Sequence, residues 1–124
     1  EILRCLVGSE MCIRDSYNIE LLKANLKDFM WNNVGIIRSE ENLLKARKEV
    51  ENLKKAFKRT RKCLNKEEYE YRNMLSVASL IIDSALSRKE SRGAHCRSDY
   101  SQLDRVARHT NLLKNEEKEL INVK

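Results

Sequence analysis

Proline is absent from the 124-residue sequence, and glycine occurs only three times. So few turn-forming residues disfavour a fold of many short strands and favour long helices. The four cysteines form no CxxC pair, which argues for a reducing compartment and against a disulfide scaffold or a zinc site. No apolar run is long enough to span a bilayer, and Arg4, Gly8 and Glu10 interrupt the first apolar residues, unlike in a signal peptide. We therefore expect a cytoplasmic, helical protein without a membrane partner.

Charged residues make up 35% of the sequence, and the surplus of lysine and arginine gives a net charge of +6. Such a surplus raises nucleic acid as a possible partner. However, Glu49 and Glu51 interrupt the basic residues between 45 and 62, which show neither interleaved aromatic residues nor a recognition motif. A solvated helix face explains them better, so we expect no nucleic-acid partner. A basic, helical nucleic-acid-binding module stays the alternative.

Residues 1–16 differ from the rest of the sequence because they lack a sustained helical stripe. The string is similar to translated sequencing-adapter read-through, and an ordinary linker is the alternative. A chain of this length has room for one modest core. We therefore expect three parts: a non-native or linker segment at 1–16, a three-helix domain at 17–100, and a tail at 101–124.

Between about residues 18 and 37, apolar residues recur at steps of three and four, which predicts a helix with one apolar side. The stripe consists of Ile19, Leu22, Leu26, Phe29 and Ile37, flanked by Met30 and Val34. At about 100° per residue, Trp31 falls on nearly the opposite side, together with the small Ala24 and Gly35. Trp31 either marks a second contact surface there or wraps around onto the same core.

Two further helices are predicted downstream. Ser39 is a plausible N-cap for the first of them, and Asn65 with Glu68 resembles a capping box that starts the other. The seam of the second helix is formed by Leu43, Ala46, Val50, Leu53 and Phe57. Steps of three and four are typical of packing against near-antiparallel neighbours. We therefore expect an all-α fold, an antiparallel three-helix bundle similar to a spectrin repeat.

The third helix is predicted to be the most buried. Between Met74 and Leu86 the only polar residues are Ser76, Ser79, Asp83 and Ser84. Apolar residues cover the remaining circumference, which is more than two neighbouring helices need, so a further surface is expected to cover part of it. A central helix in a compact bundle would show a similar pattern and is the alternative.

Charged residues crowd the segment that follows. It contains Arg88, Lys89, Glu90, Arg92, His95, Arg97 and Asp99. Cations are favoured at the carbonyl-rich end of a helix, and Gly93 is predicted to be the left-handed residue that closes it. One interpretation is an exposed helix end with ordinary surface charge. The other is a set of fixed polar contacts, which arginine side chains near carboxylates form well.

The same segment resembles a signature of the flavoprotein family that comprises L-aspartate oxidase and the flavoprotein subunits of succinate dehydrogenase and fumarate reductase. The signature is carried by Arg88, by Glu90-Ser91-Arg92-Gly93-Ala94-His95 and by Arg97-x-Asp99-Tyr100, with Ser101 where the family usually has proline. Two further stretches are most similar to the L-aspartate oxidases within the family. They are Met30-Trp31-x-x-Val34-Gly35-Ile36-Ile37-Arg38 and Glu70-x-Arg72-Asn73.

The resemblance implies FAD as the cofactor, bound by an upstream domain, and oxidation of L-aspartate to iminoaspartate in de novo NAD biosynthesis. No GxGxxG follows a strand in this sequence, so we expect no FAD-binding residue in it. The resemblance places the substrate-binding residues of the family in upstream domains, so we expect no catalytic residue either. The cysteine spacing and the lone pair His95-Cys96 predict no metal-ligating residue. The resemblance implies instead a helical buttress that docks onto the flavin domain of its own chain. The candidate docking residues are Trp31, Arg38, Arg88, Glu90, Arg92, His95 and Asp99. A succinate dehydrogenase or fumarate reductase flavoprotein is the alternative, and a coiled-coil-like adaptor is a more distant one.

The last twenty residues allow two predictions. Leu103, Val106, Thr110 and Leu113 have helical spacing, whereas residues 120–123 suit a strand. Arg108-His109-Thr110 resembles a His-Thr pair that enters a hairpin in the same family. We therefore expect extended structure from about 109 to 123, a possible β-hairpin, with its turn near 114–117.

Overall fold

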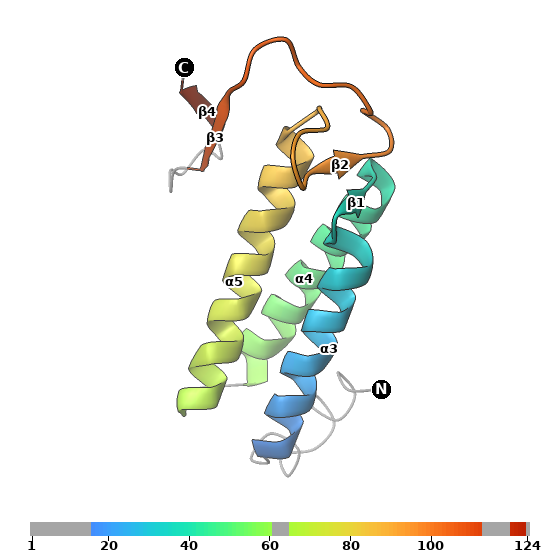
Figure 1. Cartoon of the computed structure of the whole chain (residues 1–124). Helices are drawn as coiled ribbons and strands as arrows, with labels where there is room; N and C mark the ends of the chain where they lie inside the picture. Colours follow the sequence, from blue (N-terminus) through green and yellow to red (C-terminus); the bar gives the residue numbers. More distant parts are fainter. Residues whose placement is uncertain (1–15, 61–64, 113–119, 124) are drawn as a thin grey trace.

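The computed structural model describes residues 16–60, 65–112 and 120–123. The described residues form three helices: α3 (Ser16–Val34), α4 (Glu40–Thr60) and α5 (Lys66–Ser87). The helices lie side by side, and α4 runs opposite to α3 and α5 (Figure 1). The predicted helical bundle is therefore confirmed. Of the segment predicted to be non-native or a linker, only Ser16 is described, and it begins α3.

The core lies between the three helices, and most of it consists of the residues that the apolar periodicity predicted. The buried apolar residues are Ile19, Leu22, Leu26, Val34, Leu43, Ala46, Val50, Phe57, Tyr71, Leu75, Ala78, Ile82 and Ala85. The rings of Phe57 and Tyr71 meet edge to face, with centroids 5.2 Å apart. Burial raises the pKa of Tyr71 to about 12. The core thus includes an aromatic contact that joins the end of α4 to the start of α5.

Ile37 is the exception, because it was predicted to belong to the buried stripe and is 73% exposed. The prediction is wrong because α3 ends at Val34, before the stripe reaches Ile37. A Cβ added to Gly35 would lie 2.5 Å from the carbonyl oxygen of Trp31. The chain therefore turns closely past the last turn of α3 at a place where only glycine fits.

Both predicted helix starts are confirmed. The hydroxyl of Ser39 accepts a hydrogen bond from the N–H of Asn42 (3.3 Å) at the start of α4. At the start of α5, the Asn65 side chain accepts from the N–H of Glu68 (2.9 Å), and the Glu68 carboxylate accepts from the N–H of Asn65 (3.0 Å). These contacts satisfy backbone donors that have no partner within the helix.

Short strands complete the described structure. β1 (Ile37–Arg38) pairs in parallel with β2 (Cys96–Arg97), and β3 (His109–Leu112) pairs antiparallel with β4 (Leu120–Val123). The second pair is the predicted hairpin, whose predicted turn at 114–117 lies outside the described residues. After β2 the chain arches over one end of the bundle to reach β3 (Figure 1). None of the described helices is long and apolar enough to cross a membrane.

Candidate docking site

Residues 88–104, called the closing segment below, lie across one end of the bundle, and Arg97 is their most buried side chain (1% exposed). Its Nη1 donates to the carbonyl oxygens of Ala85 (3.0 Å) and Leu86 (3.4 Å) in the last turn of α5. Its Nε donates to Asp99 (2.8 Å). Carbonyls at a helix C-terminus lack partners within the helix and attract cations. Arg97 is therefore a buried cap for α5.

Asp99 extends this cap to a second helix. Its pKa is lowered to about 2, chiefly by the hydrogen bond from Arg97 and in small part by the nearby backbone of Glu40. Glu40 is the first residue of α4, where the helix dipole favours an anion. The Arg97–Asp99 pair therefore lies between the C-terminus of α5 and the N-terminus of α4, with each charge near the end that stabilises it.

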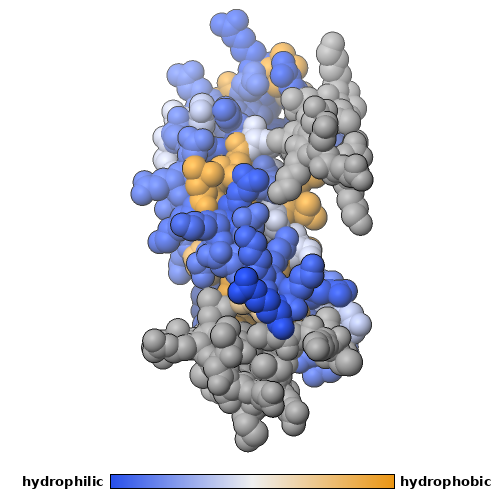
Figure 2. Space-filling view, turned by 180° about the vertical axis from the view of Figure 1, so that it is seen from behind, coloured by the Kyte–Doolittle hydropathy of each residue, from blue (hydrophilic) through white to orange (hydrophobic). Residues whose placement is uncertain are grey.

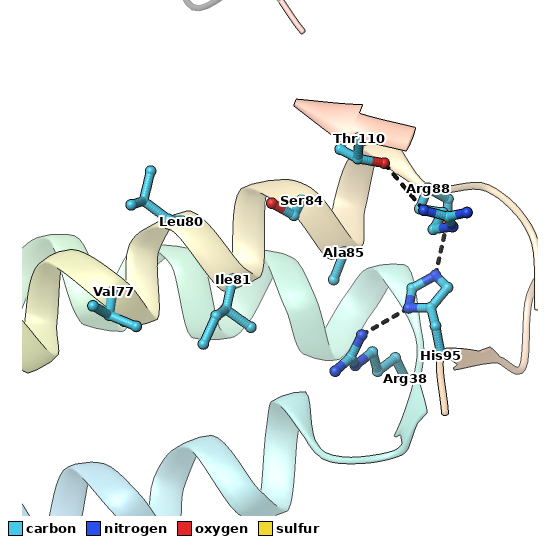
Figure 3. Close-up of a pocket in the computed structure, with 9 residues that line it drawn as sticks. All are labelled: Arg38, Val77, Leu80, Ile81, Ser84, Ala85, Arg88, His95 and Thr110. Atoms are coloured by element: carbon cyan, nitrogen blue, oxygen red, sulfur yellow. Dashed lines mark hydrogen bonds between the residues drawn. The ribbon is translucent and has the colours of Figure 1, made fainter. Parts of the chain in front are cut away.

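His95 lies between the ends of α3 and α5 (Figure 3). Its Nδ1 is 2.7 Å from Nη1 of Arg38, and its Nε2 is 2.9 Å from the carbonyl oxygen of Arg88. Arginine can only donate, so Nδ1 accepts and the proton of the neutral ring is on Nε2. Burial lowers the pKa of His95, and the positive charges of Arg38, Arg97 and Arg88 lower it further. A neutral histidine thus bridges two helix ends.

Glu90 is the acidic centre of the closing segment and is only 6% exposed. Its two carboxylate oxygens accept from Nε of Arg88 and Nε of Arg92, each at 3.1 Å. One oxygen also accepts from the backbone N–H of Asp104 (3.0 Å). This N–H is the main cause that holds the pKa of Glu90 below its ordinary value, against the opposing effect of burial. Glu90 therefore fixes two arginines and the far end of the closing segment at once.

The two arginines also reach the chain that returns toward β3. Arg88 donates from Nη2 to the carbonyl oxygen of Arg108 (2.9 Å) and from Nη1 to the hydroxyl of Thr110 (3.4 Å). Arg92 donates from Nη2 to the carbonyl oxygen of Asp104 (3.0 Å). These contacts place β3 beside the end of α5. The fixed polar contacts, one of the two interpretations of this segment, are therefore what the structure contains.

Gly93 does not close α5, contrary to the prediction. The helix ends at Ser87, and Arg88 is its C-cap, whose N–H donates to the carbonyl of Ser84 (3.2 Å). Gly93 has φ = 60° in a two-residue turn between Arg92 and His95, which exchange backbone hydrogen bonds of 2.8 and 3.0 Å. A glycine with positive φ at the first central position is typical of a type II′ turn. The left-handed residue was predicted correctly, but it was assigned to the wrong element.

The structure brings together most of the predicted docking residues. Arg38, Arg88, Glu90, Arg92, His95 and Asp99 belong to one connected set of polar contacts. Trp31 does not belong to it and is 71% exposed on α3. Arg97 is central to the set and was not predicted as a site residue. The Arg-x-Asp spacing could have identified it, because residues two apart on an extended strand point to the same side.

A groove between α3 and α5 leads to this polar set. Its lower part is a hollow of about 500 Å³ lined by Leu26, Lys27, Met30, Glu70, Asn73, Met74, Val77, Ala78 and Ile81. Its upper part is a hollow of about 320 Å³ lined by Arg38, Val77, Leu80, Ile81, Ser84, Ala85, Arg88, His95 and Thr110 (Figure 3). Val77 and Ile81 line both parts, so we treat them as one feature, the α3–α5 groove.

Large apolar side chains are exposed along this groove. Val77, Leu80 and Ile81 are 53%, 54% and 42% exposed. Trp31 of α3 is also exposed (71%), but it lines neither part of the groove. Figure 2 shows the molecule from behind the view of Figure 1, where hydrophilic side chains surround several hydrophobic patches. The predicted extra apolar surface on the third helix is therefore present, and it lies beside the predicted docking residues.

Comparison with known proteins identifies the family. The family described as fumarate reductase flavoprotein C-term matches residues 23–124. The chain belongs to this family. One similar protein, L-aspartate oxidase 1 of Ralstonia nicotianae, is 41% identical over 81 residues. These residues are 62% of this chain and 15% of that protein. An uncharacterized FAD-dependent oxidoreductase of Methanocaldococcus jannaschii is 36% identical over 93 residues, which are 73% of this chain and 17% of that protein.

This chain is also similar in structure to part of a solved protein. The structure described as Mycobacterium smegmatis Sdh1 in complex with UQ1 superposes with a TM-score of 0.63 at 26% sequence identity. The match covers 85% of this chain and 20% of Sdh1. The chain thus spans between 15% and 17% of the length of the two curated relatives above.

Proposed function

We propose that this chain is the C-terminal helical domain of an FAD-dependent L-aspartate oxidase, and that it buttresses the flavin-binding part of the same protein. That longer protein is called the parent protein below. It would bind FAD upstream of residues 17–100, lie in the cytoplasm, and oxidise L-aspartate to iminoaspartate for NAD biosynthesis. In this proposal residues 101–124 are a tail that includes the hairpin. The chain supplies support to the parent protein, and the chemistry takes place upstream.

Sequence similarity favours L-aspartate as the substrate over a dicarboxylic acid without an amino group. The L-aspartate oxidases of Ralstonia nicotianae and Pseudomonas aeruginosa are 41% and 39% identical to this chain. In the structural superposition, Sdh1 of Mycobacterium smegmatis is 26% identical. These names describe the complete relatives, of which this chain matches only a part. FAD is proposed for the parent protein because of the family to which the chain belongs.

The observation that carries the proposal is the position of the groove. The exposed apolar residues Val77 and Ile81 line the same groove as the predicted docking residues Arg38, Arg88 and His95. Exposed apolar surface of this kind marks an interaction site, because each Å² removed from water stabilises a complex by about 25 cal/mol. Trp31, a residue type enriched at interfaces, is exposed as well, outside the residues that line the groove. An independent bundle would have no need of this surface.

The polar contacts of the closing segment suit a support rather than an active site. The arginine and carboxylate groups already bind one another, so they set the shape of the docking surface. Replacing Arg92 by Ala in the parent protein should lower its thermal stability and FAD content. The ratio of kcat/KM for L-aspartate to that for succinate should stay the same. Arg105→Ala is the matched control, because Arg105 is exposed and lies just after the closing segment. Normal stability and FAD content in Arg92→Ala would refute the docking role.

A succinate dehydrogenase or fumarate reductase flavoprotein is the second candidate. It is favoured by the fumarate reductase description of the family and by the superposition on Sdh1. The parent protein should therefore be purified and assayed with L-aspartate and with succinate, and its flavin should be identified by absorbance. Turnover of succinate without turnover of L-aspartate would establish this candidate in place of the first.

Nucleic-acid binding has one feature in its favour, the basic outer face of α4. However, Arg47 on this helix pairs with Asp83 of α5 (3.3 Å), and Glu49 and Glu51 separate the lysines on either side. We propose that this face is solvated. A salt-dependent shift of a generic DNA duplex in a gel at low ionic strength would contradict that assignment, since phosphate contacts are strongest there.

A further inference from the structure

The upper end of the α3–α5 groove combines positive charge with apolar walls. Its lining includes Arg38, Arg88 and His95, and the other described residues that line it are apolar or carry hydroxyl groups. No aspartate or glutamate lines this part of the groove among the described residues. A partner that fills it therefore needs apolar groups for most of its area and a negative charge at this end.

Arg38 differs from the other arginines of the closing network. Arg88 and Arg92 both bind Glu90, and Arg97 binds Asp99. Arg38 instead donates from Nε to the carbonyl of Gly35 (2.7 Å) and from Nη1 to His95 (2.7 Å). Within the described residues it has no carboxylate partner, and its Nη2 donates no hydrogen bond.

The surroundings of Arg38 make this missing counter-ion significant. Burial lowers the pKa of Arg38, which means that its positive charge is less well solvated than in water. A partly buried guanidinium with a free donor gains a strong, charge-assisted hydrogen bond when a carboxylate reaches it. Arg38 is therefore the natural anchor for an acidic group that enters the groove.

We infer that the α3–α5 groove receives a segment of the parent protein's flavin-binding part, which lays apolar side chains on Val77 and Ile81 and presents a carboxylate to Arg38. This inference rests on the proposed function and adds the chemistry of the partner surface. The chain covers only 17% and 15% of two curated relatives, within a family described as a C-terminal part, so the rest of the parent protein is long enough to supply this segment. A segment of the same polypeptide has a high effective concentration at the groove, so it is favoured over a separate protein.

The apolar half of the inference is tested in the parent protein with a matched pair of variants. Val77→Gln places a neutral polar group in the groove, and Leu44→Gln makes the same change on α4, outside the residues that line the groove. The two side chains are similarly exposed, at 53% and 49%. Val77→Gln should lower the melting temperature of the parent protein by roughly 2–4 °C more than Leu44→Gln. Equal effects of the two variants would overturn the groove as the docking surface.

The carboxylate half is tested with Arg38→Gln, measured in two settings. In the 124-residue chain this variant removes the internal contacts with Val34, Gly35 and His95, so it reports the internal role of Arg38. In the parent protein the variant also removes the contact with the partner carboxylate. The loss of unfolding free energy should therefore be larger there, and Arg38→Lys should restore part of the difference because it keeps the charge. An equal loss of unfolding free energy in both settings would overturn the carboxylate contact and leave the proposed function standing.

Two further results separate the inference from its competitors. Sedimentation of the 124-residue chain as a dimer that Val77→Gln dissociates would assign the groove to a second copy and overturn the inference. A parent protein without flavin would overturn the proposed function instead. Val77→Gln would in that case still report whether the groove contacts the upstream part of the same protein.

Discussion

The bundle and the closing segment are held together by different interactions. Between the helices most buried contacts are apolar, and Leu43, Ala46 and Ile82 have no exposed surface. Two ion pairs, Lys23–Glu70 and Arg47–Asp83, join the helices closer to the surface. In the closing segment the buried side chains are instead Arg97 and Glu90. An apolar core tolerates exchange of similar side chains, whereas a buried charge depends on its particular partners. The bundle therefore has many interchangeable contributors, and the closing segment has one arrangement fixed by a few atoms.

The largest expected effect lies in the bundle. Ile82→Ala should lower the free energy of unfolding by about 2–5 kcal/mol, because it removes a buried side chain and leaves a cavity. The loss should be global, so circular dichroism and amide hydrogen exchange should report the same destabilisation. The adjacent Ile81, 42% exposed, is the matched control, and Ile81→Ala should cost clearly less. Equal losses would contradict the division between core and groove.

The next effect should be confined to the closing segment. Arg97→Met should cost about 3 kcal/mol, because Asp99 and the carbonyls at the end of α5 lose a buried partner. Amide exchange should accelerate at Arg92 and His95, while amides in the middle of α4 keep their protection. Arg105→Met, at an exposed site, should stay within about 0.5 kcal/mol of the original chain. Equal acceleration throughout the helices would show that both regions form one cooperative unit.

The pH dependence should be smaller and should also distinguish the regions. The pKa of His95 is below its ordinary value of 6.5, so the unfolded chain takes up this proton at a higher pH than the folded chain. The stabilisation by neutral His95 is therefore complete above about pH 6.5 and is lost as the pH falls from there through the lowered pKa. Unfolding titrations should show this loss, and His95→Gln should abolish it. His109→Gln, at an exposed histidine, is the control and should keep the loss.

The smallest effect concerns a polar contact within the bundle itself. Asn65→Ala should cost about 1 kcal/mol, because it removes the side chain that caps α5. The same substitution at the exposed, mid-helix Asn73 should instead stabilise by a few tenths of a kcal/mol, since alanine has the higher helix propensity. Thermal unfolding measures both. The opposite signs would show that polar groups matter in the bundle only where backbone donors lack partners.

The same division explains what could be predicted from the sequence. Apolar spacing identified the cores of all three described helices, and one N-cap and one capping box identified where α4 and α5 begin. Both signals are local and repeat over several turns. Ile37 was misplaced because the spacing continues past Gly35, where the backbone cannot. The hairpin in the tail was predicted from family resemblance, because the spacing of Leu103 and Val106 equally suited a helix.

Most members of the candidate site could be predicted from the sequence, but the contacts between them could not. The charged residues of the closing segment were identified, yet several of their partners lie at distant positions that no local pattern specifies. Arg88 reaches Thr110, and His95 reaches Arg38. Arg97 was missed although its partner Asp99 is only two residues away, because its other partners are carbonyl groups of α5, and carbonyl groups belong to every residue. Docking by these residues stays a prediction until the parent protein is tested.

The parallel pairing of Ile37 with Cys96 has a consequence for the order of folding. These two residues are far apart in the sequence, so their pairing must close a long loop before any contact compensates the lost chain entropy. The contacts between α4 and α5 join neighbours in the chain and can form early. We therefore expect the helical hairpin of α4 and α5 to form first, and β1 and β2 to join last. Substitutions at this strand pair should accelerate unfolding and leave the rate of folding almost unchanged.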